Sequence, residues 1–301
     1  MDTDRLLDDL LARVDPDRLR ELTLDLVRIP SPTGDAEAVT AHYAEVVRAL
    51  GLEIEVLHEF PGGPSTVTHV PGARQGRALT LDGHLDTIHA PHEAPYVAGD
   101  RIVGRGAGDM KSGIAAQIFA LETLQHAGIP LKGSFVSSAV PDEETGGQPG
   151  MGYLVRSGRL TKENTDYCII TEPLDPDMIC LGHRGTLWFT LTFKGVQSHG
   201  SMPSEGLNPI EGMRALLERI DRRIRPQLER VSKYPVSPER SRKSTLCITT
   251  IQAGSKVNTI PDTCSASFDW RLIPEQSVEW AKGEILSICD DLVREGVILE
   301  Y

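Results

Sequence analysis

The chain has 301 residues, of which 40% are hydrophobic and 25% charged, values close to the average of globular proteins. Its length is typical of about two domains, and its composition excludes disordered, collagen-like and disulfide-scaffold chains. The net charge of −12 argues against a nucleic-acid-binding protein, which needs a basic face. Residues 1–180 carry 15 Lys and Arg against 28 Asp and Glu. This acidic excess is either a solvated surface or a cation-binding carboxylate cluster.

The cysteines and the N-terminal segment indicate in which cellular compartment the protein is expected. The five cysteines are scattered without a C-x-x-C pair, which predicts free, mostly buried thiols in a reducing compartment. The acidic N-terminal segment lacks the basic and apolar regions of a signal peptide. No run of about 18 apolar residues, the length that a membrane span needs, is present. These features predict a cytoplasmic protein with no membrane partner.

The first part of the chain alternates predicted helices and strands. Asp15 as N-cap and Pro16 at the first helical position predict a helix that ends before Pro30. A second helix is expected between residues 34 and 51, and a third from about 109 to 127. Strands are expected near 52–56, 65–70, 77–82, 135–140 and 167–171, the last two of them buried. This alternation is typical of an α/β layered domain, which we predict over residues 1–182.

The pattern changes after residue 182. A strand at 187–193, a helix at 208–224, strands near 245–253 and 263–270 and a helix at 275–295 are predicted, with a loop over 225–243. The order β-α-β-β-α needs one more strand to complete a ferredoxin-like α+β unit. Residues 297–299 predict the incomplete start of that strand. A second domain is therefore predicted over residues 183–301.

Four polar motifs share a position at the end of a predicted strand or at the start of a predicted helix. They are LDGHLDT with His84 and Asp86, GRGAGDMKSG with Asp109, VPDEETGG with Asp142, Glu143 and Glu144, and IITEP with Glu172. Each has an ordinary alternative, namely a surface loop, a helix N-cap, a solvated acidic turn and a surface residue that ends a strand. Together they form a mixed nitrogen and oxygen set where open α/β sheets place their sites. Such a set suits Zn²⁺, Co²⁺ or Mn²⁺.

These motifs, in this order, resemble the zinc-dependent peptidases and amidohydrolases that include succinyl-diaminopimelate desuccinylase, acetylornithine deacetylase, aminoacylase and carboxypeptidase G. The matching segments are GHLDT, GRGAGDMKSG, PDEETGG, TEP, GHRGTLWF, GVQSHGSMP and VNTIPDTCSASFDWR. The resemblance implies a zinc-peptidase-like catalytic domain with an inserted ferredoxin-like domain that serves as lid and dimerisation domain. It also implies hydrolysis of an amide bond in N-acyl amino acids or small peptides, as in a deacylase or desuccinylase.

The resemblance further implies a site for two zinc or cobalt ions. His84 and Glu172 would bind one ion, Glu144 would bind the other, and Asp109 would bridge them. Two metals that share a carboxylate are the usual basis of a two-metal hydrolytic site.

Three further residues take catalytic roles in the family. Glu143 would be the general base that accepts a proton from a metal-activated water and passes it to the leaving amine. Asp86 would support His84. His199 would reach the site of a neighbouring subunit and stabilise the oxyanion, which implies a homodimer. Without the family, His199 is an ordinary loop histidine.

Arg184, Asn258 and Arg271 match family positions that hold a substrate carboxylate, which an arginine can do with two parallel hydrogen bonds. Their ordinary alternatives are a surface arginine, a turn asparagine and an arginine that ends a strand.

The sequence departs from the family at its C-terminal end. Family members continue from the lid into a segment that returns to the catalytic domain and carries the last His ligand. None of the remaining histidines lies in that motif, so we expect the return segment to be absent. The chain would then be a fragment, a truncated reading frame or a protein completed by another chain. The alternative function is a non-catalytic dimerisation or binding protein of the same fold, whereas the intact carboxylates and His84 favour the enzyme.

Overall fold

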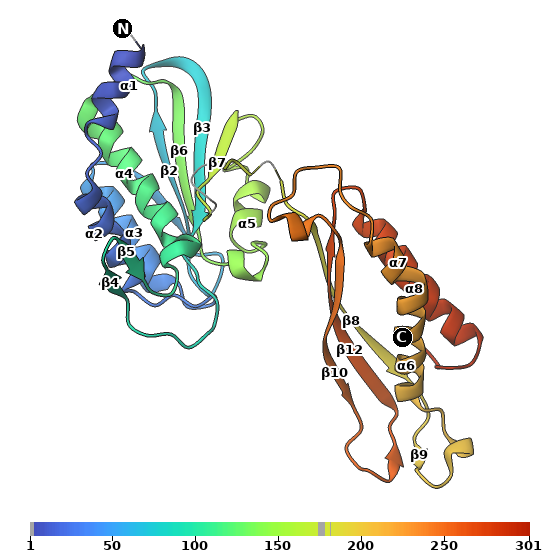
Figure 1. Ribbon diagram of the computed structural model, residues 1–301. Helices are drawn as coiled ribbons and strands as arrows, with labels where there is room; N and C mark the ends of the chain where they lie inside the picture. The colour runs from blue at the N-terminus through green and yellow to red at the C-terminus, as the bar shows by residue number, and fades with distance from the viewer. Residues whose placement is uncertain (1–2, 174–177, 181) are drawn as a thin grey trace. The chain divides into compact units, whose positions relative to one another are not determined.

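The computed structural model describes residues 3–173, 178–180 and 182–301. The chain divides into two compact units, Met1–Met178 and Ile179–Tyr301. Each unit is a β-sheet with helices packed against it (Figure 1). The predicted α/β class is therefore confirmed. Among the described residues, no helix combines the length and the apolar character needed to cross a bilayer.

The sheet of the first unit brings three parallel strands together. Its strands, in spatial order, are β1 (Ile54–Leu57), β2 (Ser65–Pro71), β6 (Lys132–Val140), β3 (Arg74–His84) and β7 (Tyr167–Ile170). β6, β3 and β7 pair in parallel, whereas β1 and β2 are antiparallel to their neighbours. The carboxyl ends of the three parallel strands consequently meet at one edge, as Figure 1 shows. A small separate ribbon is formed by β4 (Tyr96–Ala98) and β5 (Arg101–Val103).

Helices cover both faces of this sheet. The helices of this unit are α1 (Thr3–Leu11), α2 (Pro16–Val27), α3 (Glu37–Ala49), α4 (Ser112–Ala127) and α5 (Met151–Arg156). α2, α3 and α4 lie on one face and bury an apolar cluster there, whereas α5 contributes Leu154 to a cluster on the other face (Figure 1). α2 begins as predicted, because the Asp15 carboxylate accepts hydrogen bonds from the first backbone amides and Pro16 occupies the first turn.

Two predictions of burial are corrected. The segment at 167–171 forms β7, but all four residues of this strand are exposed. β7 is an edge strand that pairs only with β3, and no element in the described part of the chain covers it. The five cysteines are free, but only two are buried. Cys264 and Cys289 are buried, whereas Cys168, Cys180 and Cys247 are exposed.

The second unit has the predicted β-α-β-β-α order. Its main elements are β8 (Gly185–Lys194), α6 (Pro209–Arg219), α7 (Arg225–Leu228), β10 (Thr245–Ala253), β12 (Thr263–Leu272) and α8 (Val278–Arg294). β12 lies between β10 and β8, and its alternate residues are buried against the helices. Two short strands, β9 (Ser198–His199) and β11 (Thr259–Ile260), pair with each other. Leu299 and Glu300 exchange backbone hydrogen bonds with Lys194, so a further strand begins beside β8 as predicted.

The predicted loop over 225–243 begins too early. A π-helical turn, Ile220–Ile224, continues α6 into α7. Ile220, Ile224 and Leu228 are all buried, so the apolar face of the helix extends one turn further than expected. The wider turn explains how the chain tolerates Pro226, which has no backbone N–H to donate.

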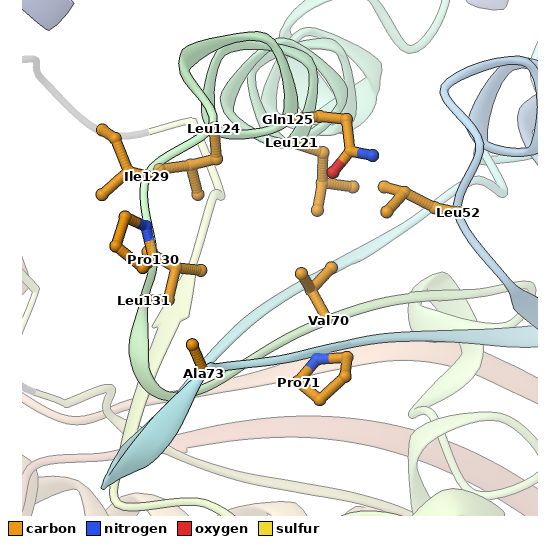
Figure 2. A pocket seen from close by; sticks show the side chains of 10 residues that line it. All are labelled: Leu52, Val70, Pro71, Ala73, Leu121, Leu124, Gln125, Ile129, Pro130 and Leu131. Carbon is orange, nitrogen blue, oxygen red and sulfur yellow. The ribbon is translucent and has the colours of Figure 1, made fainter.

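An apolar cavity of about 250 Å³ lies at the amino end of β3. Figure 2 shows Leu121, Leu124 and Gln125 of α4 facing Val70 and Pro71 of β2 across it. Apart from the Gln125 amide, its lining side chains are apolar, and they include no titratable group. His84 lies at the opposite end of β3, so this cavity is separate from the candidate site described next.

Candidate metal centre

Three of the singled-out side chains converge at the carboxyl edge of the first sheet. His84 ends β3, Glu143 lies in the turn that follows β6, and Glu172 follows β7. One potential ligand atom from each lies within 4.8 Å of the others. The parallel register of the three strands explains this convergence, because it places their ends side by side.

The His84 imidazole is the centre of this group and is almost completely buried. Its Nε2 lies 3.0 Å from Asp109 Oδ1, 3.4 Å from Glu172 Oε1 and 3.7 Å from Glu143 Oε2. Its Nδ1 lies 3.0 Å from the Asp86 carbonyl oxygen and 3.2 Å from Asp86 Oδ1. With Nδ1–H donated to Asp86, the lone pair of Nε2 points toward three carboxylates, which is the tautomer that a metal needs.

The concentration of negative charge around His84 favours the binding of a cation. Burial by itself lowers the pKa of His84, but hydrogen bonds and charges from Asp86 and Glu172 outweigh it and raise the pKa to about 11. Burial and the neighbouring carboxylates raise the pKa values of Glu143 and Glu144. Both directions reflect an excess of negative charge in a partly desolvated site. The donor set therefore fits a divalent metal ion.

The buried Asp86 carboxylate contacts both His84 and the turn that carries Glu143 and Glu144. Its side chain is fully buried and accepts hydrogen bonds from Thr33 Oγ1 at 2.6 Å, Glu143 N at 3.1 Å and Glu144 N at 3.3 Å. Burial alone would raise the pKa of Asp86, but the hydrogen bonds from His84 and Thr33 lower it. Asp86 thus fixes both the His84 ring and the acidic turn. No local sequence pattern indicates a role for Thr33, because its contact with Asp86 spans 53 residues.

The Asp109 loop is anchored by a buried lysine. Asp109 lies in the turn Ala107–Lys111, where its backbone angles are non-helical, and it does not cap α4. Lys111 is buried and donates from Nζ to the carbonyl oxygens of Leu26 at 3.1 Å and Ile29 at 2.7 Å, at the end of α2. Burial lowers the pKa of Lys111 to about 8. Because Asp109 has non-helical backbone angles and does not cap α4, the alternative interpretation of this residue as a helix N-cap is wrong.

Glu144 is placed differently from the other predicted ligands. It lies in the same short turn as Glu143 and is half-buried, but in the described part of the chain it forms no ion pair with His84. Its charge interacts with Asp109, the residue predicted to bridge two metals. The geometry brings Glu143, the predicted base, into the donor cluster, so the division of roles between these two residues stays a prediction.

His199 and Asn258 lie together in the second unit. His199 is exposed on β9, opposite Thr259, and the amide of Gly200 donates to the Asn258 carbonyl at 2.8 Å. The His199 Nδ1 lies 2.7 Å from Ser201 Oγ, and among the described residues no hydrogen bond to its Nε2 is found.

Arg184 and Arg271 lie at the end of the β10–β12–β8 sheet where Leu272 pairs with Gly185. His199 lies in the separate β9–β11 pair, a few residues along the chain from the opposite end of that sheet, where Thr263 pairs with Lys194. Arg271 forms two hydrogen bonds with Asp269, at 2.7 and 3.1 Å, and lies over the Trp188 ring. The structure of this unit does not bring the four predicted residues into one cluster.

Comparisons with known proteins agree with this arrangement. Residues 181–297 match the M20 family model described as peptidase dimerisation domain. The succinyl-diaminopimelate desuccinylase of Methylobacterium radiotolerans is 32% identical over 286 residues, which is 90% of this chain and 70% of the relative. That of Xylella fastidiosa is 30% identical over 285 residues, which is 90% of this chain and 72% of the relative.

Solved structures share the fold. A tripeptidase from Staphylococcus aureus has a TM-score of 0.68 at 21% identity, over 92% of this chain and 71% of that one. An M20 family metallo-carboxypeptidase from Sulfolobus solfataricus has a TM-score of 0.70 at 17% identity, over 91% and 75%. The resemblance predicted from the motifs is confirmed. This chain belongs to the M20 family of metal-dependent peptidases and amidohydrolases, together with succinyl-diaminopimelate desuccinylase.

Proposed function

We propose that this chain hydrolyses the amide bond of N-acyl amino acids or short peptides that carry a free carboxylate, in the manner of a deacylase or desuccinylase. The observation that carries the proposal is the buried His84, whose Nε2 faces carboxylates from the ends of neighbouring parallel strands. The names of the curated relatives favour an acylated amino acid as the substrate.

The residues of the centre have separable tasks. His84, Asp109, Glu144 and Glu172 would hold zinc or cobalt, and two ions in the full family pattern. When bound, such metals lower the pKa of water and polarise the scissile carbonyl. Glu143 accepts a proton as the water oxygen attacks the carbonyl carbon, and it returns this proton to the amine as the C–N bond breaks. Its half-exposed carboxylate and raised pKa suit this proton transfer.

The proposal is tested by hydrolysis with the purified chain. N-succinyl and N-acetyl amino acids and dipeptides are offered with Zn²⁺ or Co²⁺, before and after removal of metal by a chelator. We expect chelation to lower kcat/KM by at least about 100-fold, because metal ions contribute several kcal/mol to such reactions. Re-addition of metal should restore the rate. A folded chain that binds metal but hydrolyses no substrate of the panel would support a non-catalytic binding protein instead.

The proposed domain roles follow the same pattern. Residues 1–182 would form the catalytic domain, and residues 183–301 would form the lid and dimerisation domain, which the family match supports. Arg184, Asn258 and Arg271 would hold the substrate carboxylate. The separation of His199 and Asn258 from the two arginines favours a site to which two subunits contribute. A cytoplasmic location is part of this proposal.

The contribution of His199 to a neighbouring subunit is tested by mixing two inactive variants. His199→Ala and Glu143→Gln should each be nearly inactive alone. Mixed dimers would contain one intact site, so reassociation at equal amounts should restore about one quarter of wild-type activity. Light scattering should show a dimer at micromolar concentration. A mixture that stays inactive although mixed dimers form would place His199 in its own subunit's site.

A further inference from the structure

A relay of buried and half-buried hydrogen bonds runs through the first unit toward the candidate metal centre. Ser137 Oγ on β6 donates to Gln117 Oε1 on α4 at 3.0 Å, and Gln117 Nε2 donates to Thr171 Oγ1 at 2.9 Å. Thr171 Oγ1 donates in turn to the Asp82 carbonyl oxygen at 3.5 Å. Because the only hydroxyl hydrogen of Ser137 is used, the Tyr43 hydroxyl on α3 donates to Ser137 Oγ, at 3.2 Å. Every member therefore has a partner, and all bonds run in one direction.

Most of the relay lies in the buried core, whereas its Thr171 end is half-buried. Tyr43, Gln117 and Ser137 are completely buried. Both ends of the Gln117 amide are used, so the loss of a partner on either side leaves a buried polar group without a hydrogen bond. Gln117 is thereby fixed in one orientation.

α4 also touches the Thr171 backbone directly. A Cβ atom at Gly113 would lie 2.0 Å from the Thr171 carbonyl oxygen, so only glycine allows this approach. Gln117 follows Gly113 by one helical turn, and the two residues hold the same segment. The Thr171 amide donates to the Asp82 carbonyl oxygen at 3.2 Å, which ties this segment to β3.

The contact between α4 and Thr171 lies next to two residues of the candidate metal centre. Thr171 directly precedes Glu172, whereas α4 begins three residues after Asp109. One helix therefore sets the spacing between two carboxylates that face His84. We propose that Gln117 and Thr171 are positioning residues, which hold Glu172 relative to Asp109 and His84 for metal binding. The inference rests on the proposed metal-dependent function.

The experiment removes the Thr171 hydroxyl and measures metal binding by the full chain. Thr171→Val keeps the shape of the side chain, and Thr171→Ser keeps the hydroxyl. Thr40→Val is the matched control, because Thr40 is buried and its hydroxyl donates at 2.8 Å to the carbonyl oxygen of Ala36, the N-cap of α3. The probes are Zn²⁺ affinity by calorimetry and the visible absorption spectrum of the Co²⁺-loaded chain. Unfolding of each metal-free variant gives its stability.

We expect Thr171→Val to bind Zn²⁺ about 10-fold more weakly, the usual effect of changing a group that orients a ligand, with an altered Co²⁺ spectrum. Thr171→Ser and Thr40→Val should bind within about twofold of the wild type, although Thr40→Val loses comparable stability. Gln117→Met interrupts the relay from the helix and serves as the second variant if Thr171→Val does not fold.

Two contrary results are distinguishable. Wild-type affinity and an unchanged Co²⁺ spectrum in Thr171→Val, or in Gln117→Met where the first variant does not fold, would overturn this inference alone. A folded wild-type chain that binds neither metal would overturn the proposed function and this inference with it.

Discussion

Replacement of Glu143 by Gln is expected to lower kcat by about 100- to 10,000-fold, the usual contribution of a general base, while the chain still binds metal. Gln has nearly the same size and keeps a hydrogen-bond acceptor, but it cannot take up a proton at neutral pH. The half-exposed Glu143 carboxylate is reachable from solvent. Kinetics with the best substrate of the panel and calorimetric titration with Zn²⁺ measure the two quantities separately.

Glu144→Gln is the matched variant, since both residues lie in the same short turn. If Glu144 is a ligand, this variant should bind metal at least about 10-fold more weakly, and its activity should recover as metal is added. The structure makes the comparison necessary, because Glu143 Oε2 lies 3.7 Å from His84 Nε2. Loss of metal from Glu143→Gln together with full occupancy in Glu144→Gln would exchange the two roles.

The sequence predicts those parts of the structure that depend on local pattern. The Asp15 cap and the strands near 77–82 and 167–171 follow from residues close together in the chain, although the first of these strands continues to His84. The convergence of the strand ends follows in turn from the general topology of open α/β sheets.

Contacts between residues far apart in the chain are visible only in the structure. The hydrogen bond from Thr33 to Asp86 spans 53 residues, and the one from Gln117 to Thr171 spans 54. Thr33 and Gln117 carry no local signal of a role. The exposure of β7 was also unpredictable, because an apolar edge strand and an apolar central strand have the same pattern. The sequence also does not distinguish a helix N-cap at Asp109 from a residue in a non-helical turn before the helix. Only the backbone angles separate these two possibilities.

Replacement of Asp86 by Ala is expected to affect both stability and metal binding. The change removes the acceptor that Thr33 Oγ1 and the amides of Glu143 and Glu144 share. It also leaves His84 Nδ1 with only the backbone carbonyl of residue 86 as its acceptor. Loss of one partner of a buried ionic group costs about 3–5 kcal/mol of unfolding free energy. Loss of the group that orients a metal-binding histidine should weaken Zn²⁺ binding by about 10- to 100-fold. Thr33→Val, which removes one of the donors, should cost about 1 kcal/mol.

The distribution of tryptophan provides an internal control for this measurement. Trp188, Trp270 and Trp280 are the three tryptophans of the chain, and all lie in the second unit. Tryptophan fluorescence therefore reports the unfolding of the second unit, whereas far-ultraviolet circular dichroism reports both. In metal-free Asp86→Ala, we expect an earlier denaturant transition by circular dichroism and an unchanged transition by fluorescence. Equal shifts of both transitions would show that the two units unfold together. Wild-type stability and wild-type Zn²⁺ affinity would show that Asp86 does not organise the centre.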